Sequence, residues 1–387
     1  MHTLAQWDVF CRVVDNYGDI AVSWRLARQL TREHGLGVRL WVDDLTRFHA
    51  LRPEIDPSRP QQRLEGVEVR QWTQPFPTTA PAEVVIEAFG CGLPADYLAA
   101  MAARRPPPVW VNLEYLSAEA WVRGCHGLPS PHPRLPLTCW FFYPGFTAGT
   151  GGLMREAGLD AARARFLAAE QDDFWARLGL PPRPPGELRV SLFGYENPVL
   201  ADLLAQWAAG ARPVRCVVPA GRILAAVLHF FGRGDVPPAG LTLALGHLNV
   251  HCIPMLPQED YDRLLWACDL NFVRGEDSLV RALWAERPLV WQAYPQAAGA
   301  HRPKLEALLD RYAQDLPTPA AKALRRFTLA WNGFGGALDW AAFEAQLPAL
   351  RARASDWARQ LQGLGDLAGN LVAFCRTKAG HTGTAPT

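Results

Sequence analysis

Two short stretches of the chain combine acidic side chains with glycine in a way that can do chemistry. The first is VVDNYGDI, whose acids are Asp15 and Asp19. Between them stand Asn16, Tyr17 and Gly18. A carboxylate pair suits an acceptor that is cationic or that must lose a proton, and Gly18 allows a sharp turn or the close approach of a substrate. A structural alternative remains open, in which Asp19 caps the following helix and Asp15 stabilises the turn.

The second stretch, DLNFVRGEDSLVRALWA, changes from a strand pattern to a helical pattern through five polar or small residues. They are Arg274, Gly275, Glu276, Asp277 and Ser278. A helix N-terminus favours a diphosphate, and Arg274 adds a charge-assisted contact to the same oxygens. A carboxylate at this place has a role if it binds sugar hydroxyls or orients another catalytic group. The alternative is a capping box, in which Ser278 or Asp277 caps the helix and Glu276 is solvated.

Neighbouring loops supply further polar and aromatic candidates. Gln258 precedes a helical segment in IPMLPQEDYDRLLWACDL. Phe193 and Tyr195 alternate in SLFGYEN, and Tyr294 follows the strand pattern of WQAYPQ. Aromatic residues at such positions pack in the core in most proteins, and otherwise they hold a base or form the wall of a sugar site.

Two acidic pairs have the form of metal motifs. Asp260 and Asp262 match a DxD pattern, but they stand at the front of a predicted helix, where acids are common. Asp43 and Asp44 follow a predicted strand. We interpret both pairs as structural acids, and we expect no metal site.

The elements that must position these residues alternate between strand and helix patterns, which predicts an α/β fold with parallel sheets. No GxGxxG motif accompanies the first strand. The stretch 123–152 is rich in Pro and Gly and is predicted to be a loop, 155–178 is predicted to be helical, and 180–187 to be a linker. The predicted strands of the first half are WDVFCRVV, VRLWVDDL, VEVRQW, EVVIEAFG and PPVWVNLEYL, and those of the second half are ELRVSLFGYE, RPVRCVVPA, LNVHCIPM, DLNFVRG and PLVWQAYP.

Length and composition favour two globular domains. The chain has 387 residues, of which 49% are hydrophobic and 20% charged, and the net charge is +1. This balance gives no electrostatic reason to expect nucleic acid as a partner. The sequence predicts no membrane span and no signal peptide. Its eight cysteines lack paired spacing, which indicates reduced thiols and a cytoplasmic protein.

Taken together, VVDNYGDIAVSWRLARQL, SLFGYEN and LPQEDYDRLLWACDLNFVRGEDSLVRALWAERPLVWQAYPQ resemble the protein-arginine rhamnosyltransferases that modify translation elongation factor P, the EarP family. The resemblance spans nearly the whole chain. It implies a GT-B fold with two Rossmann-like domains facing a central cleft. The expected domains are 1–180, joined by C-terminal helices at about 345–380, and 186–344, which binds the nucleotide sugar.

The resemblance also implies an activity. Family members are inverting, metal-independent enzymes without a cofactor that move L-rhamnose from dTDP-β-L-rhamnose to one arginine of bacterial elongation factor P. By similarity, Asp19 is the principal catalytic aspartate, Asp15 its companion and Glu276 an essential glutamate. Many relatives have Phe where this chain has Met255. The substrate-binding positions that it implies are Asn16, Tyr17, Gly18, Phe193, Tyr195, Met255, Gln258, Arg274, Gly275, Asp277, Ser278 and Tyr294.

Two other functions fit the same residues. One is a sugar-nucleotide epimerase or hydrolase, which would turn over the donor without an acceptor protein. The other is a non-catalytic adaptor, which would bind the factor without changing its mass. The paired acids favour an enzyme, because a docking surface has no need for carboxylates beside a phosphate site.

Overall fold

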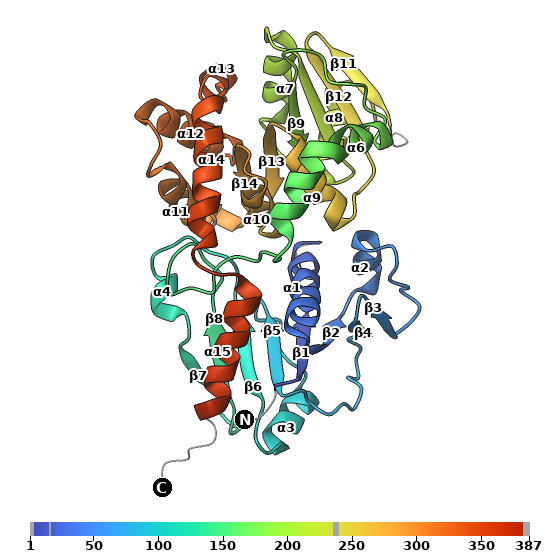
Figure 1. Cartoon of the computed structure of the whole chain (residues 1–387), viewed down its shortest axis with the longest axis vertical. Coiled ribbons are helices and arrows are strands. Elements are labelled where there is room, and N and C mark those ends of the chain that lie inside the picture. The colour runs from blue at the N-terminus through green and yellow to red at the C-terminus, as the bar shows by residue number, and fades with distance from the viewer. Residues whose placement is uncertain (1–3, 15–16, 235–239, 382–387) are drawn as a thin grey trace. The chain divides into compact units, whose positions relative to one another are not determined.

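The computed structural model describes residues 4–14, 17–234 and 240–381. The chain forms two compact units, each built around its own sheet (Figure 1). Unit 1 consists of Met1–Ala157 and Leu361–Thr387, and unit 2 of Gly158–Gln360. The α/β class with two Rossmann-like units is as predicted.

The sheet of unit 1 has eight strands in the order β3-β4-β2-β1-β5-β6-β8-β7. The strands from β4 to β8 pair in parallel, and β3 and β7 add an antiparallel strand at either edge. The strands are β1 (Gln6–Cys11), β2 (Gly37–Val42), β3 (Gln61–Leu64), β4 (Val67–Gln71), β5 (Val84–Ala88), β6 (Val109–Leu113), β7 (Pro129–Pro131) and β8 (Thr138–Phe142). The helices are α1 (Gly18–His34), α2 (Leu45–Leu51), α3 (Ala95–Ala103), α4 (Val122–Cys125) and α15 (Leu367–His381).

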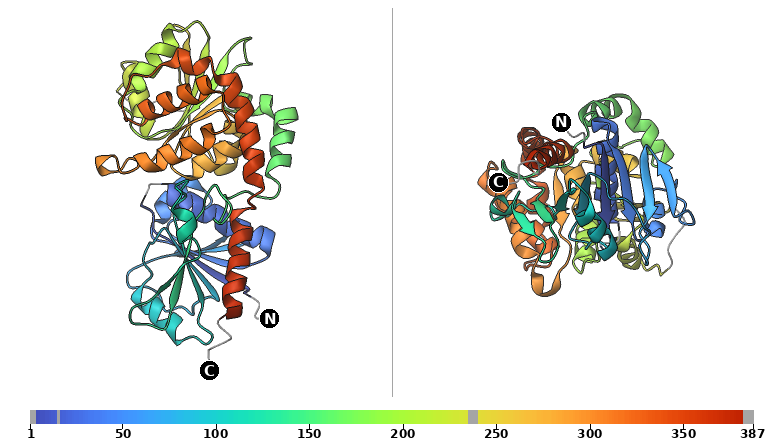
Figure 2. Two further views of the ribbon diagram at one scale, coloured as in Figure 1. Left: turned by 90° about the vertical axis from the view of Figure 1, so that its left-hand side faces the viewer. Right: turned by 90° about the horizontal axis from the view of Figure 1, so that it is seen from below.

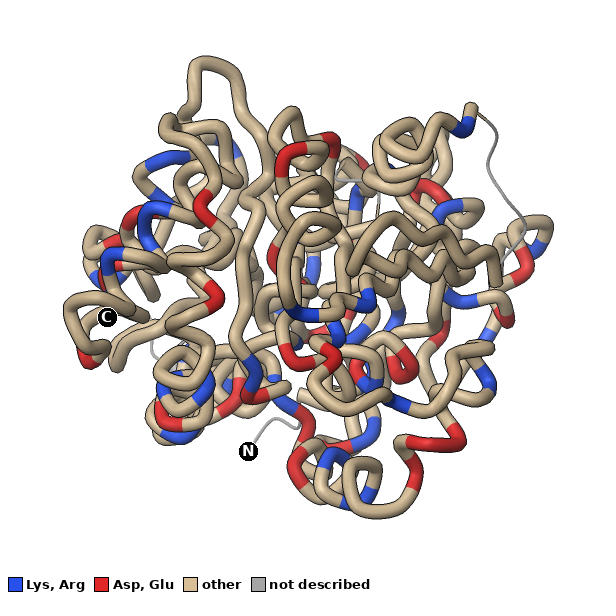
Figure 3. Tube along the Cα trace, turned by 90° about the horizontal axis from the view of Figure 1, so that it is seen from above, with Lys and Arg blue, Asp and Glu red and all other residues tan. Residues whose placement is uncertain are grey.

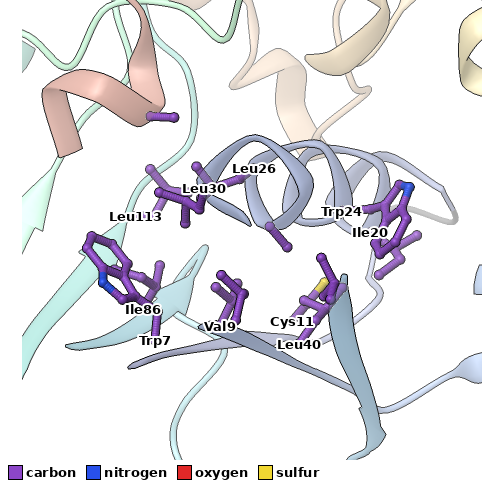
Figure 4. Packing of buried hydrophobic residues seen from close by; sticks show 14 of the residues in the cluster. Trp7, Val9, Cys11, Ile20, Trp24, Leu26, Leu30, Leu40, Ile86 and Leu113 are labelled. Carbon is purple, nitrogen blue, oxygen red and sulfur yellow. The ribbon is translucent and has the colours of Figure 1, made fainter. Parts of the chain in front are cut away.

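Helix α1 covers one face of this sheet because its apolar residues recur on one side. Ile20, Leu26 and Leu30 of α1 are fully buried and face the strand residues Val9 and Leu40 (Figure 4). Burying each such side chain contributes about 1.5–3 kcal/mol. The C-cap of the helix is a glycine in the left-handed conformation (Gly35, φ 65°).

The sheet of unit 2 has six strands in the order β11-β12-β10-β9-β13-β14, all parallel except β11 at the edge. The strands are β9 (Leu188–Leu192), β10 (Val214–Pro219), β11 (Thr242–Leu245), β12 (Leu248–Ile253), β13 (Leu270–Arg274) and β14 (Leu289–Gln292). The helical segments are α5 (Leu159–Arg165), the π-helix η1 (Phe166–Glu170), α6 (Gln171–Arg177), α7 (Leu200–Ala209), α8 (Arg222–Phe230), α9 (Gln258–Ala267), α10 (Asp277–Trp284), the 3-10 helix η2 (Ala297–Gly299), α11 (Arg302–Ala313), α12 (Thr318–Trp331), α13 (Trp340–Glu344) and α14 (Leu347–Gln362).

The C-terminal helix α15 returns to unit 1 and lies along its sheet (Figure 2). Polar contacts hold the start of this returning segment. The amide of Gln29 donates to Asp366 Oδ1 at 3.0 Å and to the Arg155 carbonyl at 2.9 Å. The amide of Asn370 donates to the Gly151 carbonyl at 3.1 Å. The segment from residue 361 onward belongs to unit 1.

The boundaries of the units differ from the predicted ones. Residues 158–180 lie in unit 2, because Phe166 packs against Trp266, with ring centroids 5.6 Å apart, and Arg189 lies over Trp175 at 4.6 Å. Most of α14 also belongs to unit 2, where Trp357 contacts Tyr312 at 4.8 Å. The helical pattern shows that these segments have a buried face, but not which sheet covers it.

A second difference concerns the stretch 123–152, which the sequence predicts to be a loop. It contains β8, a parallel strand beside β6, and the short antiparallel β7. The prolines and glycines around β8 mark real turns. Between these turns, β8 pairs with β6 in the sheet, and Phe142 of β8 lies opposite Leu113 of β6. The prediction was wrong here because β8 gains its hydrogen bonds from a neighbour distant in sequence.

Among the described residues, no helix is both long and apolar enough to cross a membrane. All eight cysteines are present as free thiols, and six of them are buried. Basic and acidic residues are interspersed along the described part of the trace (Figure 3).

Gly151 offers a test of the packing under the returning segment. A Cβ added there would lie 2.3 Å from Cε1 of Phe142, whose ring is buried. We expect Gly151→Ala to lower the free energy of unfolding of unit 1 by about 1–3 kcal/mol, as overpacking does. Urea unfolding measures this change. The control is Gly124→Ala in α4, where a Cβ meets nothing within 4 Å; an equal loss in both variants would contradict the packing explanation.

Candidate active site

Each sheet has one point at which the order of its strands reverses. In unit 1, β1 lies between β2 and β5, and in unit 2, β9 lies between β10 and β13. In such folds the connections after β1 and its neighbour β5, and after β9 and its neighbour β13, run to opposite faces of the sheet and open a crevice where ligands bind. In unit 1, the loop after β1 leads directly to Asp19. In unit 2, the loops after β9 and β13 are the SLFGYEN and RGEDS stretches.

The site in unit 2 is built around a buried arginine. Arg274 ends β13, and its side chain lies between two aromatic rings, 4.7 Å from the centroid of Phe193 and 4.6 Å from that of Tyr195. Both rings follow β9, and the backbone N–H of Tyr195 donates to Gln292 Oε1 at 2.9 Å. Contact with two aromatic rings restrains the guanidinium group. Phe193 and Tyr195 are therefore buried side chains that also contact Arg274.

The turn after Arg274 is held in a defined shape. Gly275 has a φ of 63°, which favours glycine, and its carbonyl accepts a hydrogen bond from Trp291 Nε1 at 2.7 Å. Helix α10 begins at Asp277 with Glu276 at its N-cap, and the Glu276 side chain makes no capping hydrogen bond. The capping-box alternative is therefore not observed. Ser278, which is buried, belongs to the first turn.

A lysine that the sequence analysis did not select contacts Glu276. Lys304 of α11 places its Nζ 2.5 Å from Glu276 Oε1. In addition, the buried Arg281 binds Asp262 through two hydrogen bonds of 2.9 and 2.7 Å, which join α10 to α9. Asp262 is therefore engaged in an ion pair, and Asp260 is 2.7 Å from Arg263.

The remaining predicted residues of unit 2 lie around this core. Tyr294 is 42% exposed and stands edge-on to Tyr195, with ring centroids 5.5 Å apart. Gln258 is buried at the start of α9. Tyr261 of α9 contacts Phe193 at 5.5 Å, and burial raises the pKa of its hydroxyl. Met255 is half-buried in the loop after β12, two strands from β9 in the order of the sheet.

In unit 1, Asp19 is 3% exposed and lies one residue inside α1, whose N-cap is Tyr17. It is therefore not the N-cap. Its Oδ2 accepts the backbone N–H of Val14 at 2.8 Å, which closes the loop. Gly18 is the first residue of α1. Asp15 and Asn16 lie outside the described residues.

One side chain beside Asp19 was missed by the sequence analysis. The hydroxyl of Tyr115, which follows β6, is 3.5 Å from Asp19 Oδ1. Its ring is 40% exposed and stacks on Phe89 at 4.6 Å. Glu114 precedes it and accepts from the amide of Asn112 at 2.8 Å. The available signal was an acid and an aromatic residue near the end of the strand pattern PPVWVNLEYL.

The acids after β2 also contribute to this edge. Asp43 Oδ1 accepts the backbone N–H of Val13 at 2.9 Å, and Asp44 caps α2 by accepting from Arg47 N–H at 2.9 Å. Both are structural, as predicted. Among the residues that the structure describes, no three His, Cys, Asp or Glu side chains gather as they would around a metal ion.

Comparison with known proteins assigns the chain to a family. The model of the elongation factor P rhamnosyltransferase EarP matches residues 7–376. The chain belongs to the EarP family. A protein-arginine rhamnosyltransferase of Pseudomonas aeruginosa is 50% identical to it over 380 residues, which cover 96% of this chain and 99% of the relative. One of Pseudomonas putida is 49% identical over 375 residues, covering 96% and 99%.

Solved structures agree with this assignment. A structure that describes EarP-mediated arginine glycosylation of translation elongation factor EF-P has a TM-score of 0.67 and 35% identity, covering 96% of this chain and 99% of that one. A glycosyltransferase of Rickettsia africae has a TM-score of 0.50 at 7% identity and covers 97% of each chain. The latter shows the fold alone. This member of the EarP family is thus an enzyme of the glycosyltransferase class with a GT-B type fold.

The ion pair between α9 and α10 should be essential for the stability of unit 2. Arg281 and Asp262 are 2% and 7% exposed. We expect Arg281→Met to lower the free energy of unfolding by about 3–5 kcal/mol, because Asp262 is left as a buried charge without its arginine. Denaturant unfolding measures this. Arg325→Met is the control, because it removes an arginine that is 40% exposed and pairs with Asp310 at the surface; its cost should stay below about 1 kcal/mol. Similar costs for the two variants would contradict the prediction.

Proposed function

We propose that this chain transfers L-rhamnose from dTDP-β-L-rhamnose to one arginine side chain of translation elongation factor P. The observation that carries the proposal is the place of the two acidic motifs. In a member of the EarP family, they follow the strands at the two switch points, where ligands bind in folds of this class. Because the acceptor is a translation factor, we propose that the reaction takes place in the cytoplasm.

On the donor side, Arg274 and the N-terminus of α10 bind the diphosphate. The guanidinium is held by rings on two sides, and the helix directs its positive end to the same place. Gly275 lets the phosphate approach the backbone. Phe193, Tyr195, Met255, Gln258 and Tyr294 surround the nucleoside and the sugar, with Asp277 and Ser278 in the first turn of α10.

On the acceptor side, Asp19 binds the guanidinium of the substrate arginine. A guanidinium has a pKa of about 12 or higher, so it arrives charged and is a poor nucleophile until a proton is removed or shared. The Val14 N–H holds one oxygen of the Asp19 carboxylate, and the other faces the Tyr115 hydroxyl at a long 3.5 Å. That second oxygen accepts the proton. Asp15 orients Asp19, and Asn16, Tyr17 and Gly18 complete the loop.

The proposed step is a single in-line displacement. A nitrogen of the guanidinium attacks the anomeric carbon of the sugar, and the bond from this carbon to the diphosphate oxygen breaks. The proton of the attacking nitrogen passes to Asp19, and dTDP leaves with the bonding electron pair. The configuration at the anomeric carbon inverts.

Positioning and electrostatics account for the acceleration. Holding the two reactants in line contributes up to about 7–11 kcal/mol, and general-base assistance adds roughly 10²–10⁴-fold. Arg274 and α10 stabilise the charge that develops on the leaving diphosphate. The step therefore requires neither a metal ion nor a cofactor in this proposal, and Glu276 serves the donor side.

Incubation of the protein with elongation factor P and dTDP-β-L-rhamnose tests the activity directly. We expect the intact mass of the factor to rise by one deoxyhexose unit, localised to one arginine by fragmentation. An incubation with donor alone is the control, because rapid turnover without the factor indicates an epimerase or hydrolase. Binding of the factor with no change in its mass would instead support a non-catalytic adaptor.

Substitution of Asp19 tests its role. Asp19→Asn keeps an oxygen that can accept the Val14 N–H, so the loop should remain closed. We expect transfer to fall by roughly 10²-fold or more, since the general base is lost, while the affinity for dTDP measured by calorimetry stays within about 3-fold of the wild-type value, a change of less than ~1 kcal/mol. Asp56→Asn, at an exposed loop acid of unit 1, is the matched control. A fully active Asp19→Asn enzyme would end this assignment.

A further inference from the structure

Lys304 is an unusual residue in this chain. The sequence contains three lysines, at 304, 322 and 378, against 36 arginines. The Nζ of Lys304 lies 2.5 Å from Glu276 Oε1, and the two side chains are 26% and 17% exposed. Charges in such a half-buried place interact more strongly than at the surface, because less water screens them.

The position of Lys304 has no explanation in the stability of its own helix. It stands in the first turn of α11, where the helix dipole disfavours a cation and where there is no acidic residue. The start of α11 is nevertheless well anchored. His301, its N-cap, accepts the backbone N–H of Gln296 at 3.1 Å, and its ring lies 4.8 Å from that of Phe334. The fold therefore holds the Lys304 ammonium group against Glu276 even though its charge is unfavourable for the stability of α11.

Glu276 creates an electrostatic problem that this cation resolves. Glu276 is the N-cap residue of α10, directly beside the turn that binds the diphosphate in the proposed function. The Glu276 carboxylate and the diphosphate are both anions and repel each other. This repulsion weakens donor binding or forces the carboxyl group to take up a proton. A cation in contact with Glu276 offsets both effects.

The choice of lysine fits this role better than arginine. An ammonium is a compact charge with three donors, whereas a guanidinium is wide and planar and needs a larger space. In a chain that uses arginine for almost all of its cations, a lysine at this contact indicates that the compact group is required.

We propose that Lys304 is a positioning residue that holds the Glu276 carboxylate ionised and in place while the anionic donor occupies the neighbouring turn. This inference rests on the proposed function, since it assigns the donor to that turn. Lys304 acts on the donor through Glu276 and is not itself a ligand of the phosphates.

The binding of dTDP, measured by calorimetry without an acceptor, tests this inference. We expect Lys304→Met to weaken dTDP binding by about 10-fold, a size typical of the loss of a residue that orients a ligand group. In Glu276→Gln the repelling charge is gone, so adding Lys304→Met to it should change the affinity by less than about 2-fold. Lys304→Arg should fall between the wild type and Lys304→Met. The matched control is Lys322→Met, at an exposed lysine of α12, which should bind as the wild type does.

Each contrary result has a distinct meaning. If dTDP binding stays weak in the double variant, Lys304 contacts the phosphate directly and the positioning role is wrong. The ion pair has a structural role if Lys304→Met lowers the melting temperature and if the effects of Lys304→Met and Glu276→Gln on dTDP affinity add in the double variant. Equal dTDP affinity of the wild type and Lys304→Met also overturns the inference. A wild-type protein that neither binds dTDP nor modifies elongation factor P contradicts the proposed function instead.

Discussion

The rest of each unit depends on one constraint: the first strand of the unit lies inside the sheet and is paired with a later strand on each side. When β9 receives β10 on one side and β13 on the other, the connections that follow must go to opposite faces of the sheet. Only there do the loops after two adjacent strands diverge and leave backbone groups open to a ligand. The same arrangement of β2, β1 and β5 in unit 1 brings the segment with Asp19 to an equivalent place.

Both candidate sites contain carboxylates in partly dry surroundings, and three of these carboxylates have a specific partner. Asp19 accepts a backbone N–H, Glu276 contacts a lysine and Asp262 binds an arginine through two hydrogen bonds. Burial alone would remove water from such charges and destabilise them. The partners oppose this effect and also fix the orientation of each of these carboxylates. Electrostatics and geometry are therefore set by the same contacts.

The fold class followed from the alternation of apolar runs and helical patterns, and so did most of the strands. The errors share one physical origin. The strand β8 was predicted to be a loop, because its hydrogen-bond partner β6 lies some 25 residues earlier and the residues around it are turn formers. The helices at 158–177 and 347–362 have clear buried faces, but a helical pattern does not say which of two sheets it covers. Tyr115 and Lys304 were missed because each acts on a residue that is close in space and distant in sequence.

The sequence by itself singled out the residues that are proposed to carry the chemistry, because acids, glycines and an arginine clustered at strand ends stand out against any structural background. It also determined the family, since the VVDNYGDI and RGEDS stretches are specific to it. Only the tertiary structure decided that these stretches occupy the switch points, that aromatic rings flank Arg274, and that Lys304 contacts Glu276. The reason is that strand order and side-chain neighbours are set by packing between segments far apart in the chain, which no local pattern encodes.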